Sequence, residues 1–214
     1  MTQRTIRNTA VLLALLAGML TLFASPTAAQ ESTPAVEPPV TVGQTELSWT
    51  GDWQYDTVNS SPEQATLTQI DAETASIMLA TYGEFAEAPV GADGQPIEGS
   101  QAVLDTFTEG FVQGVGAEFV QETAAGELED GTAWKRFDFE LQGIQLTLLV
   151  TVAASEDGGH VVSMLIGLPD QFGESLASAQ EEILLDGEPT FLEGIEPEDV
   201  GAAPASPEAT PGGV

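Results

Sequence analysis

The sequence predicts an α+β fold, in which helices pack on an antiparallel sheet. Three observations favour this class. Segments with the two-residue alternation of strands follow one another in meanders. Two segments show the spacing of an amphipathic helix. Hydrophobic residues make up 42% of the chain, which is ordinary for a globular protein. The expected order is β-β-β-α-β-β-β-β-α, and strands that meander in this way form antiparallel sheets.

The two ends of the chain differ in composition from its middle. Residues 1–29 carry two arginines before an apolar run and end in small residues, which is the pattern of a cleavable secretory signal. Residues 30–42 are expected to form a proline-rich linker. Residues 193–214 are expected to be a disordered acidic tail rich in alanine and proline. The domain is therefore predicted at residues 43–192 and outside the cytoplasm, with an uncleaved membrane anchor as the alternative.

Three strands are expected before the first helix. They cover residues 46–55, 65–70 and 75–82. In the first strand, one parity carries the bulky residues Leu47, Trp49, Trp53 and Tyr55. Residues 84–99 contain two prolines and three glycines and are expected to form a loop.

The first helix is expected to begin at Ser100, whose hydroxyl can cap it. Gly114 and Gly116 are expected to end it. Between these points an apolar stripe at helical spacing contains Val103, Leu104, Phe107 and Phe111.

Four more strands are expected at residues 118–123, 132–141, 145–153 and 161–168. The third of these is almost continuously apolar, as a central strand covered on both faces would be. Asp170 is then expected to cap a second helix. The apolar stripe of this helix contains Phe172, Leu176, Ala179 and Ile183.

This layout resembles the PsbP-like superfamily. The segments that carry the resemblance are residues 47–53, 131–134 and 168–172, the last of which leads into the second helix. The resemblance is architectural and extends over most of residues 46–186. It implies a three-layer α/β/α sandwich and a non-catalytic role, because members of this superfamily mostly bind other proteins.

Charge excludes several classes of partner. The chain has 34 acidic residues against four lysines and arginines, a formal net charge of −30. Such a surface repels nucleic acid and anionic membrane lipids. Cysteine is absent, which excludes disulfides, thiolate catalysis and zinc–thiolate sites. No nucleophile elbow or phosphate-binding loop is present. We therefore assign no catalytic, cofactor-binding or metal-binding residue.

Two carboxylate pairs represent the enzymatic alternative. Asp138 and Glu140 share a strand face, and Asp170 and Glu174 share a helical turn, so either pair suits a glycosidase-type hydrolase. The simpler interpretation is a solvated strand face for the first pair and a helix cap for Asp170. His160, the one histidine, is expected to be exposed in a turn, with a base or metal ligand as the alternative.

Weak calcium binding is a further alternative, because acidic residues gather at 127–130, at 156–157 and at Asp93. Lys135 and Arg136 are expected to form local ion pairs or, alternatively, to mark a contact site. Asn59 begins a glycosylation sequon. The tryptophans at positions 49, 53 and 134, with Tyr55, are expected in the core, with a sugar-stacking platform as the alternative.

Taken together, these patterns predict a secreted or cell-envelope binding domain without enzymatic activity, whose partner is a protein. A carboxylate-dependent hydrolase and a calcium-binding exported domain are the alternatives.

Overall fold

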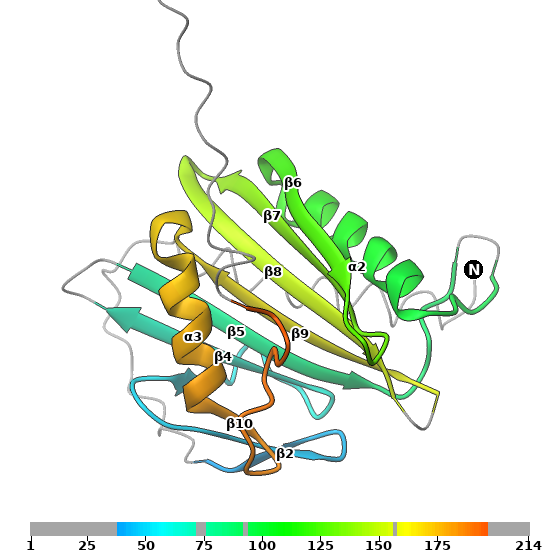
Figure 1. Ribbon diagram of the computed structural model, residues 1–214, viewed down its shortest axis with the longest axis horizontal. Helices are drawn as coiled ribbons and strands as arrows, with labels where there is room; N and C mark the ends of the chain where they lie inside the picture. Colours follow the sequence, from blue (N-terminus) through cyan, green and yellow to red (C-terminus); the bar gives the residue numbers. More distant parts are fainter. Residues whose placement is uncertain (1–37, 72–75, 92–93, 156–157, 197–214) are drawn as a thin grey trace, which may run out of the picture.

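The computed structural model describes residues 38–71, 76–91, 94–155 and 158–196. The predicted signal segment and most of the predicted tail lie outside these ranges. A twisted seven-stranded sheet forms the centre of the molecule, with a helix on each face and a smaller sheet beside it (Figure 1).

The elements follow one another as β1 (Val40–Val42), β2 (Thr45–Trp49), β3 (Gln54–Tyr55), β4 (Gln64–Asp71), β5 (Ser76–Phe85), α2 (Ser100–Val115), β6 (Glu118–Glu127), β7 (Ala133–Leu141), β8 (Ile144–Ala154), β9 (His160–Gly167), the 3-10 turn η1 (Pro169–Gln171), α3 (Phe172–Glu182) and β10 (Ile183–Leu185).

Both sheets are antiparallel throughout the described residues. The large sheet has the order β3-β4-β5-β9-β8-β7-β6, and the small one has the order β1-β2-β10. β8 lies between β7 and β9, and its residues 146–152 are all buried. The predicted α+β class and the central position of this apolar strand are confirmed.

Strand alternation divides the core into two clusters, one on each face of the large sheet. On β8, Leu148 and Val150 point to the face covered by α2, and Leu149 points to the face covered by α3. The α2 cluster includes Leu104 and Phe111, whereas α3 contributes its own apolar stripe to the other cluster. A helix on each face is therefore confirmed.

The predicted strand at residues 46–55 is wrong as a single element. It forms two strands, β2 and β3, which belong to different sheets. The chain breaks at Gly51, whose φ of 68° lies in the left-handed region that favours glycine. The prediction that alternate residues of this segment are buried still holds for Trp49 and Trp53.

The folded part extends beyond both predicted boundaries. β1 lies inside the predicted linker, and its Val42 is 1% exposed. At the other end, Ile195 is 3% exposed, inside the predicted tail. Gln180 holds this end of the chain by donating from Nε2 to the carbonyl oxygens of Leu192 and Ile195. The correction has a physical reason, since both segments bury apolar side chains against distant parts of the chain.

Both predicted helix caps are wrong. Gly99 occupies the cap position of α2, and Ser100 is already the first helical residue. Pro169 begins η1, which places Asp170 inside that turn, and no side chain caps η1 or α3. Ile183 is buried as expected but belongs to β10 rather than to the helix.

Within the described ranges, no helix combines the length and apolar character that crossing a bilayer requires.

Candidate functional site

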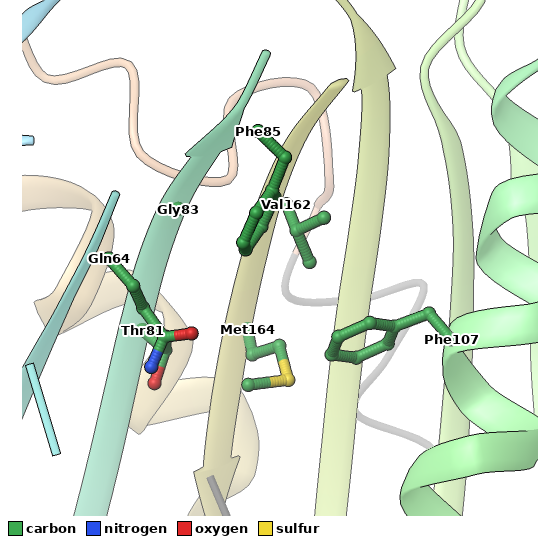
Figure 2. Close-up of a pocket in the computed structure, with 7 residues that line it drawn as sticks. All are labelled: Gln64, Thr81, Gly83, Phe85, Phe107, Val162 and Met164. Carbon is green, nitrogen blue, oxygen red and sulfur yellow. The ribbon is translucent and has the colours of Figure 1, made fainter. Parts of the chain in front are cut away.

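A shallow hollow on the α2 side of the large sheet is the candidate functional site (Figure 2). Side chains from β4, β5, β9 and α2 converge there, although they lie far apart in the sequence. The lining residues are Gln64, Thr81, Gly83, Phe85, Phe107, Val162 and Met164. The antiparallel register explains part of this set, because Thr81 pairs with Met164 and Gly83 pairs with Val162.

Gly83 leaves room for the ring of Phe85. A Cβ atom at Gly83 would lie 2.9 Å from Cε2 of Phe85 and 3.0 Å from its Cζ. The ring therefore covers a strand position that has no side chain of its own, a common setting for glycine in a strand. Phe107 approaches from α2, so two aromatic rings border the hollow (Figure 2).

The polar side chains at the β4 end of the hollow are already hydrogen-bonded. Gln64 donates from Nε2 to the backbone oxygen of Asn59 over 3.1 Å. The hydroxyl of Thr66 donates to the same oxygen over 3.2 Å and lies 3.4 Å from the hydroxyl oxygen of Thr81. Because these groups satisfy one another, the hollow presents mainly apolar surface.

The same network fixes the neighbouring loop at residues 56–60. The carboxylate of Asp56 accepts hydrogen bonds from the backbone N–H groups of Val58 and Asn59 and from Nδ2 of Asn59. The Asn59 side chain is therefore buried and bonded. In the folded domain the amide of the sequon at Asn59 is bonded within its own loop.

The hollow differs from its surroundings in charge. None of its seven lining residues is charged, although the chain carries 34 acidic residues. The hollow has a volume of about 10 Å³, which is about the space that one water molecule needs. Sites that bury small-molecule ligands measure about 300–1,000 Å³. The hollow is therefore too small to bury a whole metabolite.

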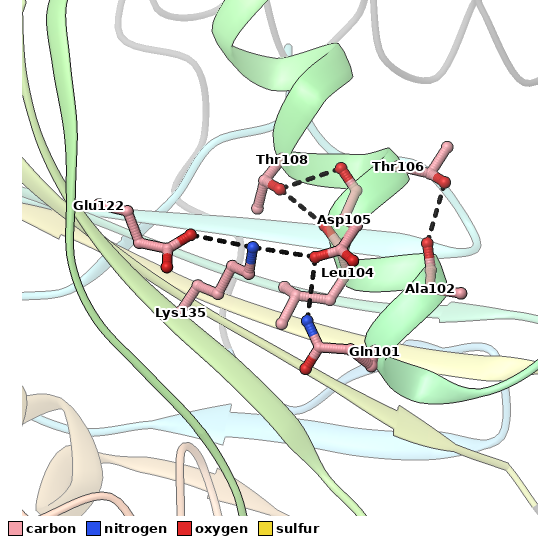
Figure 3. Close-up of polar contacts among 8 residues, drawn as sticks. All are labelled: Gln101, Ala102, Leu104, Asp105, Thr106, Thr108, Glu122 and Lys135. Atoms are coloured by element: carbon pink, nitrogen blue, oxygen red, sulfur yellow. Dashed lines mark hydrogen bonds and ion pairs between the residues drawn. The ribbon is translucent and has the colours of Figure 1, made fainter.

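Lys135 of β7 links α2 to the sheet on the same face (Figure 3). Its ammonium nitrogen lies 2.9 Å from Oδ1 of Asp105 on α2 and 2.9 Å from Oε2 of Glu122 on β6. The hydrogen bond from Lys135 lowers the pKa of Asp105. Burial acts to lower the pKa of Lys135, but the two carboxylates outweigh it and raise that pKa above its ordinary value. The local ion pairs expected for Lys135 are confirmed.

Arg136 points to the opposite face, as strand alternation requires. It is 2% exposed, its guanidinium carbon lies 5.8 Å from the ring centroid of Phe172, and its Nη2 lies 3.4 Å from Oδ1 of Asp138. Since the sheet separates Arg136 from Lys135, the two residues do not form a common basic contact site.

The two carboxylates on β7, Asp138 and Glu140, accept hydrogen bonds from neighbouring side chains. Asp138 is half-buried and accepts hydrogen bonds from Thr147 over 2.7 Å and from Arg136. Glu140 is also half-buried and accepts one from Gln145 over 2.6 Å. The prediction of a solvated strand face is wrong for Asp138, because a buried arginine lies on the same side. Asp170 and Glu174 of the second pair are both exposed.

The prediction that His160 is exposed in a turn is wrong. It is the first residue of β9, is 6% exposed, and pairs with Phe85 on one side and Ala154 on the other. Its Nδ1 atom is buried, and no described residue donates or accepts a hydrogen bond there. Burial lowers the pKa of this imidazole.

Glu84 joins the small sheet to the large one. Its carboxylate accepts hydrogen bonds from the backbone N–H of Gln44, from the hydroxyl of Thr45 and from the hydroxyl of Tyr82. Burial is the main reason that the pKa of Tyr82 is raised far above its ordinary value. This cluster fastens the turn between β1 and β2 to β5.

The tryptophans lie where the core interpretation places them. Trp49 and Trp53 are 8% and 4% exposed, and Trp134 is partly buried against the same cluster. Trp49 stacks on Tyr55 with ring centroids 5.9 Å apart. Trp53 donates from Nε1 to the carboxylate of Glu182 over 2.8 Å. The four aromatics therefore do not form an open platform for sugar stacking.

Outside the gaps at 72–75, 92–93 and 156–157, the described chain brings no three carboxylate or imidazole groups into an arrangement that could hold an ion. The acidic residues at 156–157 and at Asp93 lie outside the described residues, so calcium binding stays a prediction.

Comparisons with known proteins give little further information. No family model matches the chain, and no curated protein matches it. The PsbP-like resemblance is therefore not confirmed. Among solved structures, LpqN of Mycobacterium tuberculosis, described as involved in cell envelope biogenesis, is similar at 16% identity over 72% of this chain and 92% of its own, with a TM-score of 0.39. This likeness is too weak to indicate a function.

The sequence pattern did not reveal the hollow. Of its residues, Phe107 alone was singled out, and then as part of a helical stripe. Gly83 lies one residue beyond the strand predicted at 75–82, and only the extension of β5 to Phe85 places it inside a strand, where glycine often marks a close approach of another group. The other lining residues look like ordinary strand residues until the register brings them together.

Proposed function

We propose that this chain is an extracytoplasmic, non-enzymatic binding domain, whose hollow beside α2 receives an apolar side chain of a partner protein. The observation that carries this proposal is the absence of charge from the hollow's lining in a chain of net charge −30. An apolar anchor at the centre of an interface contributes most of the binding energy when charged groups are kept away from it.

The charge of the domain restricts the chemistry of the partner. Its formal net charge attracts basic surfaces and repels acidic ones over about 8–10 Å at physiological salt. We therefore propose a protein that presents one exposed aliphatic or aromatic side chain within a neutral or basic rim. Nucleic acids and anionic membrane surfaces do not have this chemistry.

A non-enzymatic role is supported by the contacts of the carboxylates. Asp138 and Glu140 accept hydrogen bonds from neighbouring side chains, and neither lines the hollow. A hydrolase of the glycosidase type needs two carboxyl groups that converge on a substrate.

Site-specific photo-crosslinking tests the proposal in the full chain. A photoreactive phenylalanine analogue replaces Phe107, and in a matched control it replaces Gln113, an exposed residue of the same helix. We expect a discrete protein adduct from position 107 and none from position 113. Equal adducts at both positions, or none at either, would reject the site. Hydrolysis of aryl glycosides that is abolished by Asp138→Asn would establish the enzymatic alternative instead.

A further inference from the structure

The imidazole of His160 lies on the same face of the sheet as the hollow. Strand alternation places it in line with Val162 and Met164 of β9, which both line the hollow. Its cross-strand partner on β5 is Phe85, whose ring borders the hollow. The pair formed by Phe85 and His160 therefore follows directly after the pair formed by Gly83 and Val162, which both line the hollow.

Protonation of this side chain would place a charge between the apolar residues that flank His160 in the described part of the sheet. His160 is 6% exposed, and its Nδ1 has no hydrogen-bond partner among the described residues. The residues that flank it are Phe85 and Ala154, and neither titrates. β8 carries no titratable side chain, and Glu84 of β5 points to the other face. On α2, Asp105 is bonded to Lys135, and Glu109 is bonded to Gln113.

The composition of the chain leaves His160 as its one histidine, the side-chain type that titrates near neutral pH. The chain has one histidine and no cysteine, and its acidic side chains titrate near pH 4 in unperturbed surroundings. Between pH 5 and 7, His160 is therefore the side chain whose charge responds most strongly.

We propose that His160 makes the hollow acid-sensitive: its protonation displaces Phe85 and the adjoining part of β9, and the domain releases its partner as its surroundings acidify. The release of a partner rests on the proposed function, whereas the change in the hollow is a property of this chain alone.

The direction of the pH effect follows from linkage. The unfolded chain binds a proton at His160 with the ordinary pKa of 6.5, and the folded chain binds it with a lower pKa because of burial. Between these two values the unfolded state holds more protons, so the stabilisation is complete above about pH 6.5 and is lost progressively as the pH falls.

Two NMR signals test the change in the hollow directly. The single histidine gives an unambiguous ring resonance, and the chain has four methionines, of which Met164 lines the hollow and Met78 packs on the opposite face. We expect a histidine midpoint below pH 6.5. The Met164 methyl signal should shift with the same midpoint and the Met78 methyl signal should not. A midpoint at or above 6.5, a static Met164 signal, or equal shifts of both methyls would overturn the proposal.

Stability measurements give a second, independent readout. Between pH 7 and pH 5, the melting temperature of the wild type should fall by about 2–4 °C more than that of His160→Gln. The control Gln113→His adds an exposed histidine on α2 and should show the same pH dependence as the wild type.

Crosslinking at position 107 at both pH values separates the two proposals. An adduct that is lost at pH 5.5 in the wild type but kept in His160→Gln supports both. If no adduct forms at either pH while the Met164 signal still titrates, the proposed function fails and the acid-sensitive hollow stands.

Discussion

The two faces of the seven-stranded sheet are covered differently. On one face, α3, the three-stranded sheet and the C-terminal segment around Ile195 share a single cluster of buried residues. On the other face, α2 packs on β7 and β8 and leaves the hollow beside β5 and β9. Segments from both ends of the domain cover one face, whereas a single helix covers the other. We therefore expect the first face to contribute more to the stability of the fold, whereas the second leaves the apolar hollow uncovered.

The two neighbouring basic residues illustrate the same contrast. Arg136 is buried on the closed face under the ring of Phe172. Lys135 lies on the α2 face between two carboxylates that are each about half exposed, at 54% for Asp105 and 47% for Glu122. Adjacent residues of like charge therefore have opposite surroundings, and substituting them in turn tests the comparison.

The largest effect is expected from Arg136→Ala. Truncation removes the packing on Phe172 and leaves the half-buried carboxylate of Asp138 without its positive partner. We expect a loss of about 3 kcal/mol in the free energy of unfolding, measured by urea denaturation. Arg136→Met, which keeps much of the volume, separates packing from charge. A loss below about 1 kcal/mol for the alanine variant would contradict the view that this face carries the stability.

A smaller effect is expected where the small sheet is fastened to the large one. Glu84→Ala removes the acceptor of hydrogen bonds from Gln44, Thr45 and Tyr82. Bonds to a charged group contribute about 1.5–3 kcal/mol, so we expect a loss of about 2 kcal/mol with faster amide exchange in β1 and β2. Glu87→Ala, which removes an exposed carboxylate nearby in the sequence, is the matched control and should change the stability little.

The smallest effect is expected on the α2 face. Lys135→Met keeps the aliphatic stem but removes both ion pairs, which are partly open to solvent. We expect a loss of at most about 1 kcal/mol, and the difference from the wild type should shrink in 1 M salt because exposed pairs are screened. A loss as large as that of Arg136→Ala, unchanged by salt, would show that both faces contribute equally.

Local patterns were sufficient to locate most of the elements. Alternation identified β4, β5, β7, β8 and β9, and the helical stripe of Phe172, Leu176 and Ala179 is buried as expected. These predictions succeed because side-chain periodicity is set within a single strand or helix. The predicted caps are wrong because the preceding Gly99 and Pro169 shift the helix starts. Glycine adopts the positive φ of the cap position, and proline favours the first position of a helical turn.

The sequence by itself determined the fold class, the acidity, the absence of cysteine and the burial of Trp49 and Trp53. The tertiary structure decided the rest. β1 and β10 have three residues each and exist because β2 lies between them, and His160 is buried because β5 and β8 flank it. The hollow joins residues from Gln64 to Met164. Composition and periodicity are properties of local sequence, whereas a register between distant strands depends on the whole chain.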